Sequence, residues 1–407
     1  MTNLITLFKN ILSSQLYTIS LYSRQLAGTF VLLFIARFLS VYDYGLFSSY
    51  KSIASFLLIF ANLGYNEYIL VSSKNVVRDV QLKIGFFIIN ALGTVLIIMF
   101  LSAFTPLESY LIFILVLWRS FFDNIFFLIM LPYFQATRKF NIISYVNIFY
   151  TIVTILIAIS CYLLKSSLIT FLVLCIILGI INFVQVTYYT RVNYLLSLLN
   201  LKRIFNKIDK SIFAYAGSVV CSYLYMQIPS LYISTFVDKE SAALFFAAFT
   251  VGVIMNLLNT AQSQQIIPEM INASVEKINK IMRYNLKFLL SIDLILLILF
   301  IIFGKLILVL LYGKTFYTNA YFLLLIIAIT NFSSAFIAIY GSYITASGNQ
   351  KIKIKMQVEA IIISLIVLVL LHKYGIYAAT LAYFLSASHI GIRYYFKTKQ
   401  LLALKSK

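Results

Sequence analysis

The sequence is poor in charged residues. Of its 407 residues only 11% are charged, and its 12 aspartates and glutamates stand against 32 lysines and arginines. The mean hydropathy is +0.97, and 62% of the residues are apolar. A soluble domain needs a largely polar surface, and so few charges could not cover one of this size. A soluble globular protein is therefore excluded.

Residues that build catalytic and metal centres are also scarce. The three cysteines, Cys161, Cys175 and Cys221, lie in apolar surroundings without metal-site or disulfide spacing, so we expect small buried thiols. The GxxxxGK[ST] phosphate-binding loop is missing, so ATP is not expected to drive any process within this chain. No catalytic constellation and no acidic metal cluster appear. We therefore expect no enzyme and no metal or cofactor site.

Long apolar runs fill most of the chain. Runs such as Ile292 to Leu311 have the length and hydropathy of bilayer spans, and their continuity excludes a β-barrel. Residues 1–13 lack a basic run and a cleavage site, so we expect the first span to act as its own insertion signal. The pattern predicts an all-α integral membrane protein with about twelve spans, near residues 15–37, 43–65, 84–105, 109–134, 142–163, 168–189, 212–236, 242–267, 286–311, 320–345, 355–371 and 376–392.

The net charge of +20 follows this topology. If the N-terminus is cytoplasmic, the loops on its side hold 23 lysines and arginines, and the loops on the opposite side hold 6. This bias fits the positive-inside rule with both termini in the cytoplasm. Nucleic acid is not needed to explain the basic charge.

The chain divides into two similar halves. We expect a six-helix bundle over 1–190, a cytoplasmic amphipathic linker over 191–210 and a second six-helix bundle over 211–407. FLSVYDYGLF (38–47) and FVDKESAALF (236–245) occupy equivalent junctions of the halves, as do QATRKF (135–140) and TASGNQK (345–351). Repeats of this kind are typical of secondary transporters.

Six charged residues fall at membrane depth, where they are costly and usually face a partner or a cavity. Arg24 lies about 20 Å from the level of Arg37, at 1.5 Å per residue. It shares a polar, small-residue stripe with Tyr17, Ser20, Ala27 and Gly28. Arg24 and Lys51, on neighbouring spans, are predicted to bind substrate in one shared space. The alternatives are snorkelling to the headgroups or, for Arg24, capping of a neighbouring helix. The six are Arg24, Lys51, Arg119, Asp123, Asp293 and Glu359.

Arg119 and Asp123 are four residues apart on one span, which predicts an ion pair. In the alternative, Arg119 faces a cavity and binds substrate while Asp123 modulates it. Asp123, Asp293 and Glu359 are candidates for ion coupling, although hydrogen bonding between helices is the simpler role for the last two. His389 fits a packing role better than proton carriage.

The second half offers neutral polar residues. Asn256 and Asn259 lie in line on the eighth span and are predicted to bind substrate, because amides and hydroxyls suit sugar hydroxyls. Arginine suits phosphate, since it grips two oxygens at once.

One segment carries a family resemblance. IARFLSVYDYGLFSSYKSIASFLLIFANLGYNEYIL (35–70) resembles the first-hairpin signature of the polysaccharide flippases of the multidrug/oligosaccharidyl-lipid/polysaccharide (MOP) exporter superfamily. The matching elements are Ala36-Arg37, Tyr44-Gly45 and Leu63-Gly64. Ser40 stands where that family often has glycine. Span number, loop lengths and the two-half layout extend the resemblance over the whole chain.

The resemblance implies a Wzx-type flippase that moves undecaprenyl-diphosphate-linked oligosaccharide across the bacterial inner membrane for O-antigen or capsule synthesis. It implies two six-helix bundles around a central cavity, in contact with membrane lipids. A polysaccharide polymerase and chain-length proteins are the implied partners, and nucleic acid is not. Ser23-Arg24 matches a serine-arginine pair that supplies a cavity cation in the related lipid II flippases. Two further spans of those relatives are absent here.

Two alternatives stay open at this point. A multidrug exporter of the same superfamily would prefer cationic drugs and hence an acidic cavity, against which three of the six charged residues are basic. A membrane polysaccharide polymerase or ligase would be expected to carry a long external loop, and the external connections here are all short.

Overall fold

The computed structural model describes residues 20, 23–24, 27–28, 30–31, 35–37, 39–72, 76–137, 139–190, 211–271 and 273–405. Within these ranges every regular element is a helix, which confirms the all-α prediction. The predicted linker over 191–210 and Tyr17 of the first span lie outside them.

Contacts between helices group the chain into two compact units. Unit 1 comprises 1–31 and 60–212, and unit 2 comprises 32–59 and 213–407. The stretch 32–59 thus packs with the C-terminal helices. The predicted bundle boundary within 191–210 stays a prediction.

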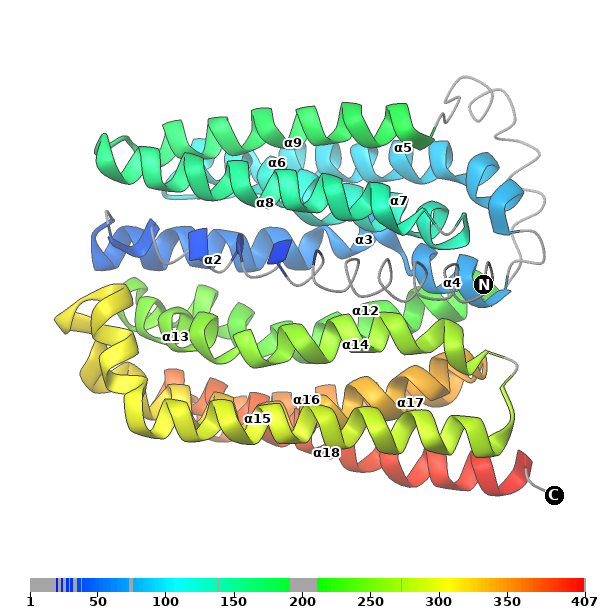
Figure 1. Cartoon of the computed structure of the whole chain (residues 1–407). Coiled ribbons are helices and arrows are strands. Elements are labelled where there is room, and N and C mark those ends of the chain that lie inside the picture. Colours follow the sequence, from blue (N-terminus) through cyan, green and yellow to red (C-terminus); the bar gives the residue numbers. More distant parts are fainter. Residues whose placement is uncertain are drawn as a thin grey trace, which may run out of the picture. The chain divides into compact units, whose positions relative to one another are not determined.

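Unit 1 contains a run of helices and one π-helix. In it, α8 packs against α9, α9 against α6, and α7 against α5 and α4 (Figure 1). The bounds are α4 Tyr65–Ser72, α5 Val76–Ser102, α6 Tyr110–Ser120, the π-helix η1 Phe121–Ile125, α7 Phe126–Ala136, α8 Phe140–Leu163 and α9 Leu168–Thr190.

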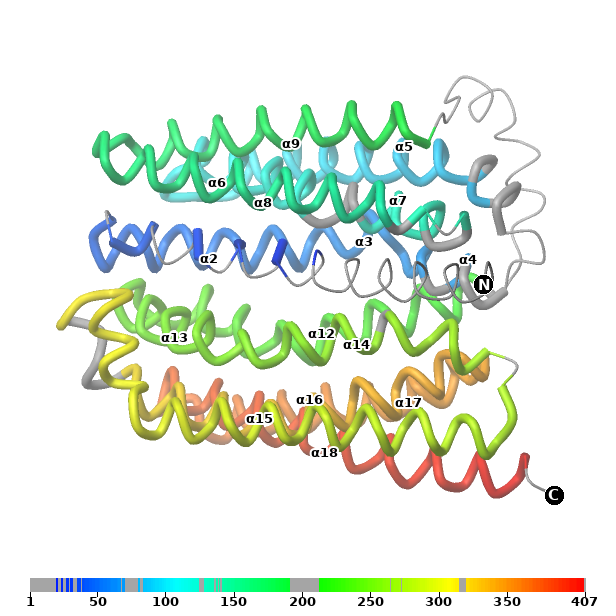
Figure 2. Tube along the Cα trace, viewed as in Figure 1, coloured from blue at the N-terminus to red at the C-terminus, as the bar shows by residue number. Residues whose placement is uncertain are grey.

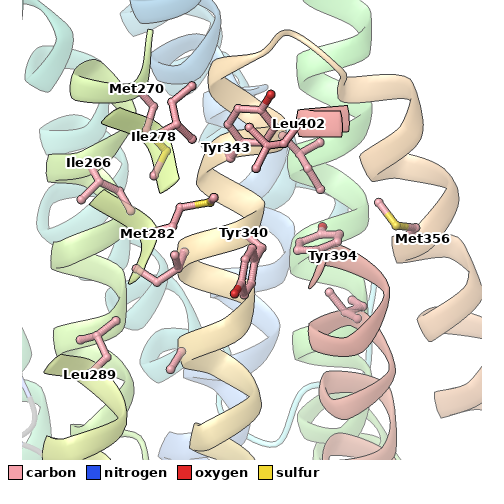
Figure 3. Packing of buried hydrophobic residues seen from close by; sticks show 14 of the residues in the cluster. Ile266, Met270, Ile278, Met282, Leu289, Tyr340, Tyr343, Met356, Tyr394 and Leu402 are labelled. Carbon is pink, nitrogen blue, oxygen red and sulfur yellow. The ribbon is translucent and has the colours of Figure 1, made fainter. Parts of the chain in front are cut away.

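Unit 2 is built around a central helix, α16, which packs against α13, α14, α15 and α18. Buried apolar side chains of α14 to α18 form one continuous core (Figure 3). The bounds are α2 Val41–Leu57, α12 Ser211–Phe236, α13 Lys239–Gly252, α14 Ile254–Met270, α15 Val275–Tyr312, α16 Lys314–Ala346, α17 Gln350–Leu370, the 3-10 helix η2 His372–Tyr374 and α18 Ile376–Lys405. The short α3, Ile59–Asn62, lies at the boundary between the units.

Several helices are long and apolar enough to cross a bilayer. In the part of the chain that the structure describes, 7 pass this test alone, and an 8th passes if α13 and α14, bent by 50°, form one span. The chain is therefore a multi-pass membrane protein. The count of twelve spans stays a prediction.

Two predicted spans each contain more than one helix. The span predicted over 43–65 breaks after α2 and again at Leu63 and Gly64, whose φ angles of 47° and 67° are left-handed. Such a conformation suits glycine and ends a helix. The span predicted over 242–267 bends between α13 and α14.

The first pair of similar segments, 38–47 and 236–245, has the same local structure in both copies. Ser40 Oγ accepts a hydrogen bond from the amide of Asp43 at 3.1 Å, and Asp238 Oδ1 accepts one from Ser241 at 2.8 Å. Each is the third residue of its ten-residue segment and the N-cap of its helix, α2 or α13. The short turn predicted at 237–240 is confirmed.

These two helices also pack closely on one another. A side-chain carbon on Gly45 would overlap the carbonyl oxygen of Lys239 and lie 3.4 Å from the amide nitrogen of Ala243. Gly45 and Ala243 are the eighth residues of the two echoing segments. The repeated segments therefore meet at equivalent small residues within unit 2.

The second echo also has one structure in both copies. After α7, the amides of Thr137 and Lys139 donate to the carbonyls of Tyr133 and Phe134, each at 3.0 Å. After α16, Ser347 donates to Tyr343 at 2.9 Å and Asn349 to Ile344 at 3.1 Å. The same pair of bonds therefore closes both helices at equivalent positions.

Candidate functional site

Unit 1 holds a buried arginine with defined partners. The Arg24 residue is only 9% exposed. Its Nη1 donates to Asn147 Oδ1 of α8 at 3.0 Å, and its Nη2 donates to the backbone carbonyl of Asp123 in η1 at 3.0 Å. Its guanidinium carbon lies 4.3 Å from the ring centroid of Tyr150, also of α8. The side chain is thus held inside the unit by two elements.

The π-helix η1 positions the second arginine and its acidic partner. Arg119, in the last turn of α6, places Nε 3.3 Å from Asp123 Oδ2. The Tyr150 hydroxyl donates to Asp123 Oδ1. The Arg119 guanidinium also lies 4.9 Å from the Phe171 ring centroid. Single π-turns within α-helices occur frequently at functional sites. The predicted Arg119–Asp123 pair is present in the structure.

The unit 1 cluster, which we define as Arg24, Arg119, Asp123, Asn147 and Tyr150, carries more positive than negative charge. It contains two guanidinium groups and one carboxylate, and that carboxylate pairs with Arg119. The side chain of Asp123 is 22% exposed, against 8% for that of Arg119. Among the described residues, Arg119 Nη1 has no hydrogen-bond partner. The cluster is therefore a cationic site in which the side chain of Asp123 is more exposed than that of Arg119.

Unit 2 holds a buried polar cluster of opposite character, which we define as Asp293, Asn259 and Asn331. Asp293 of α15 is 1% exposed and has Asn259 of α14 as a hydrogen-bond partner. Asn259 Nδ2 donates to the carbonyl of Asn331 on α16 at 3.5 Å, and Asn331 Nδ2 donates to the carbonyl of Gly252 at 2.8 Å. The unit 2 cluster thus joins three helices.

The oxygen atoms of the unit 2 cluster are under-satisfied. Asp293 Oδ2, Asn259 Oδ1 and Asn331 Oδ1 are buried and lack a hydrogen-bond partner among the described residues. Buried acceptors without donors are costly, so such a group suits a proton or a small cation. Asp293 and Asn259, predicted for separate roles, lie together in this cluster.

The remaining predicted residues lie elsewhere. Lys51 is half-buried on α2 in unit 2, and Asn256 is half-buried in the first turn of α14. Arg24 and Lys51 belong to different units, so their predicted shared space stays a prediction.

Glu359 joins two helices. It accepts from Arg393 Nε and Nη2 at 3.0 and 3.1 Å and lies 3.1 Å from His389 Nε2, linking α17 to α18. This is the hydrogen bonding between helices that the alternative to ion coupling predicted. His389 takes part in the same contact.

Sequence reasoning missed Asn147, Tyr150 and Asn331. An asparagine inside an apolar span is a signal by itself, because its amide needs partners that lipid cannot provide. Asn147 and Asn331 are both fully buried. Tyr150 carried no such signal, because tyrosine is common throughout this chain.

Solved structures of similar fold are plentiful. A MATE protein in complex with MaL6 aligns with a TM-score of 0.68 at 14% identity, over 98% of this chain and 97% of that one. An inward-facing multidrug resistance MATE family transporter of the MOP superfamily gives 0.67 at 12%, over 94% and 95%. The chain has the MATE fold.

A third solved structure of similar fold is described by the polarity of its binding pocket. It is a MOP superfamily transporter from Pyrococcus furiosus, for which reverse polarity of the binding pocket suggests a different function. It aligns with a TM-score of 0.67 at 13% identity, over 97% of this chain and 96% of that one. No protein-family model and no curated protein matches the sequence.

Proposed function

We propose that this MATE-fold protein is a flippase for a lipid-linked oligosaccharide with a diphosphate headgroup. The observation that carries the proposal is the unit 1 cluster, in which two buried arginines stand against one carboxylate, that of Asp123, which pairs with Arg119. A net cation at membrane depth is expensive and is usually retained for function. A diphosphate would supply the missing negative charge.

Arginine suits this ligand chemically. Its planar guanidinium can bind two phosphate oxygens at once, and it stays charged when buried. In this role Arg24 and Arg119 stabilise the diphosphate, while Asp123 and Tyr150 hold both guanidinium groups in place. Asn256 and Asn259 of unit 2 are the proposed contacts to the sugars, and Lys51 is a third proposed cation.

Transport by alternating access needs a source of free energy. An ion gradient can supply it, and the unit 2 cluster offers a coupling site, because Asp293 can bind a proton or a small cation among unsatisfied oxygens. We propose Asp293 as the ion-coupling residue. Its place in the MATE fold, one member of which is described as inward-facing, supports a mechanism of alternating conformations.

We also propose the substrate, the membrane and the orientation of the chain. The substrate is an undecaprenyl-diphosphate glycan, the membrane is the bacterial cytoplasmic membrane, and both termini are cytoplasmic, as the distribution of lysine and arginine predicts. The product is O-antigen or capsule. A polysaccharide polymerase and chain-length proteins are the partners.

Multidrug export is the second candidate. One neighbour of this fold is described as a multidrug resistance transporter, and the buried Asp293 could attract a cationic compound. The unit 1 cluster would oppose such a compound by its positive charge. A drug-susceptibility panel on a deletion strain separates the candidates, since only an exporter changes it.

The test of the flippase is Arg24→Ala at wild-type abundance in the membrane. Surface polysaccharide should disappear and lipid-linked repeat units should accumulate in the inner leaflet. Arg24→Lys is the matched variant, because it keeps the positive charge but cannot form a bidentate hydrogen bond to two phosphate oxygens. It should retain only part of the activity. Normal polysaccharide in the alanine strain would overturn the proposal.

A further inference from the structure

A basic face lies on the part of α15 that extends beyond the membrane. The helix has 38 residues, hence about 57 Å at 1.5 Å per residue, against a hydrocarbon core of about 30 Å. Figure 2 traces it as one unbroken helix. Its first four turns contain Lys277, Lys280, Arg283 and Lys287, all exposed. In the described part of the chain, none of the four forms an ion pair.

The four cations share one side of the helix. At about 100° per residue they fall within an arc of about 120°, together with Tyr284, which is 71% exposed. The opposite side is buried in the core of unit 2 through Ile278, Met282, Asn285 and Leu289. The exposed side therefore carries four cations and one anion, Glu276 of the first turn, and we call this net cationic surface the basic face.

The same side of α15 becomes apolar as the helix continues. Only 17% of the most apolar stretch of α15 is buried within the protein, the lowest share among the candidate spans of the described residues. The exposed side chains are Phe288, Leu294, Ile295, Ile298, Ile301 and Ile302. A lipid whose chains lie against this apolar surface has its headgroup level with the basic face.

A hollow adjoins the basic face and is lined by all four cations. Its volume is ≈ 1320 Å³, and its walls come from α14, α15, α16 and α18. Tyr340, Tyr395, Gln262 and Asn285 add hydroxyl and amide groups, and Lys399 adds a fifth cation against the single acidic group of Glu269. Tyr340 and Met282 belong to the core cluster shown in Figure 3, so the floor of the hollow is rigidly packed.

We infer that the basic face and its hollow bind the phosphate headgroup of an anionic membrane lipid, whose acyl chains lie along the apolar surface of α15. Charge complementarity selects an anion. Continuity with the lipid-facing surface selects a membrane lipid over a free phosphate. Anionic headgroups are attracted to such basic segments at the membrane surface. The site belongs to unit 2, shares no residue with the unit 1 cluster and does not depend on the proposed function.

The test uses purified full-length protein in nanodiscs of phosphatidylglycerol mixed with phosphatidylcholine, with retained lipid counted by native mass spectrometry. Lys280→Gln with Lys287→Gln should weaken phosphatidylglycerol retention by about 25-fold, at about five-fold per lysine. Lys305→Gln with Lys314→Gln is the matched control, since both lysines are exposed near the other end of α15. The control should change retention less than two-fold. Thermal unfolding verifies that both variants are folded.

Three results would overturn the inference. Equal losses in both double variants would mean that net charge alone attracts the lipid. Equal retention of phosphatidylcholine and phosphatidylglycerol would exclude selection of an anion. Displacement of the lipid by millimolar inorganic phosphate would identify a site for a free anion.

Discussion

The two units place opposite polar chemistry inside the same kind of helical bundle. In the unit 1 cluster two arginines surround one aspartate, and a π-helix supplies both Arg119's partner and the carbonyl that binds Arg24. In the unit 2 cluster one aspartate lies among asparagine oxygens. The unit 1 cluster thus suits an anion, and the unit 2 cluster suits a proton or a small cation. A transporter of an anionic lipid driven by an ion gradient needs both.

The largest effect is expected from Arg119→Leu in the unit 1 cluster. This change leaves Asp123 without its close cation and removes half of the positive charge. Breaking a buried ion pair from one side costs about 3–5 kcal/mol. Transport should fall below detection and thermal stability should fall with it. Arg119→Leu with Asp123→Leu should recover part of the stability but not transport, because the unpaired carboxylate is removed while Arg24 remains as a buried cation. Recovery of transport in the double variant would contradict a role for Arg119.

Asp293→Asn tests the unit 2 cluster and its proposed role in ion coupling. The change keeps the shape and removes the charge, so the protein should fold while transport loses its dependence on the driving ion. We expect a loss of at least ten-fold in rate, measured as glycan appearing on the outer leaflet across imposed proton and sodium gradients. Glu240→Gln on the exposed first turn of α13 is the control. Unchanged ion dependence in Asp293→Asn would separate this carboxylate from coupling.

Gly45→Ala tests the packing of α2 against α13. The added methyl group meets the backbone of Lys239, which cannot move aside as a side chain can. Overpacking of this kind costs about 1–3 kcal/mol, seen as a lower unfolding temperature in detergent. Gly93→Ala is the control, because nothing lies within 4 Å of its new methyl group. Equal stability of the two variants would contradict the close α2–α13 contact.

Glu359→Gln should have the smallest effect. The side chain is 30% exposed, and its partners Arg393 and His389 are 48% and 29% exposed. Exposed ion pairs contribute about 0–1 kcal/mol. Transport should persist in Glu359→Gln, whereas it should fail in Asp293→Asn. Loss of ion dependence in Glu359→Gln would move the coupling role from Asp293 to this residue.

Several residues of the segment 35–70 have structural roles in this chain. Arg37 Nη2 donates to the carbonyls of Val309 and Leu310 near the end of α15, with the first bond at 3.3 Å. Gly45 permits the contact with α13, and Leu63 and Gly64 form the left-handed break before α4. Arg37, Gly45, Leu63 and Gly64 thus help to maintain the fold. The resemblance therefore carries weight for the fold, and the substrate must be argued from the clusters.

Sequence reasoning located most helices because hydropathy marks where lipid is met. The predicted spans are shorter than some of the helices that contain them. For example, α15 begins at Val275, before the span predicted from 286, and α18 runs to Lys405, beyond the span predicted to 392. Their polar turns carry no hydropathy signal, although the helices continue through hydrogen bonding and packing.

The sites were predicted in part. Arg119 and Asp123 are four residues apart on one helix, so their pairing follows from local geometry. The contact of Arg24 with Asn147 joins residues 123 positions apart, and the contact of Asn259 with Asn331 joins residues 72 apart. Such contacts depend on which helices are neighbours, which a single sequence does not state.

The most direct measurement is binding of undecaprenyl diphosphate to the purified protein, with Arg24→Gln and Asp293→Asn compared side by side. Arg24→Gln should weaken binding by at least ten-fold, since a hydrogen bond to a charged group contributes about 1.5–3 kcal/mol. Asp293→Asn should leave binding within two-fold. Undiminished binding in Arg24→Gln would contradict the assignment of the anion to the unit 1 cluster.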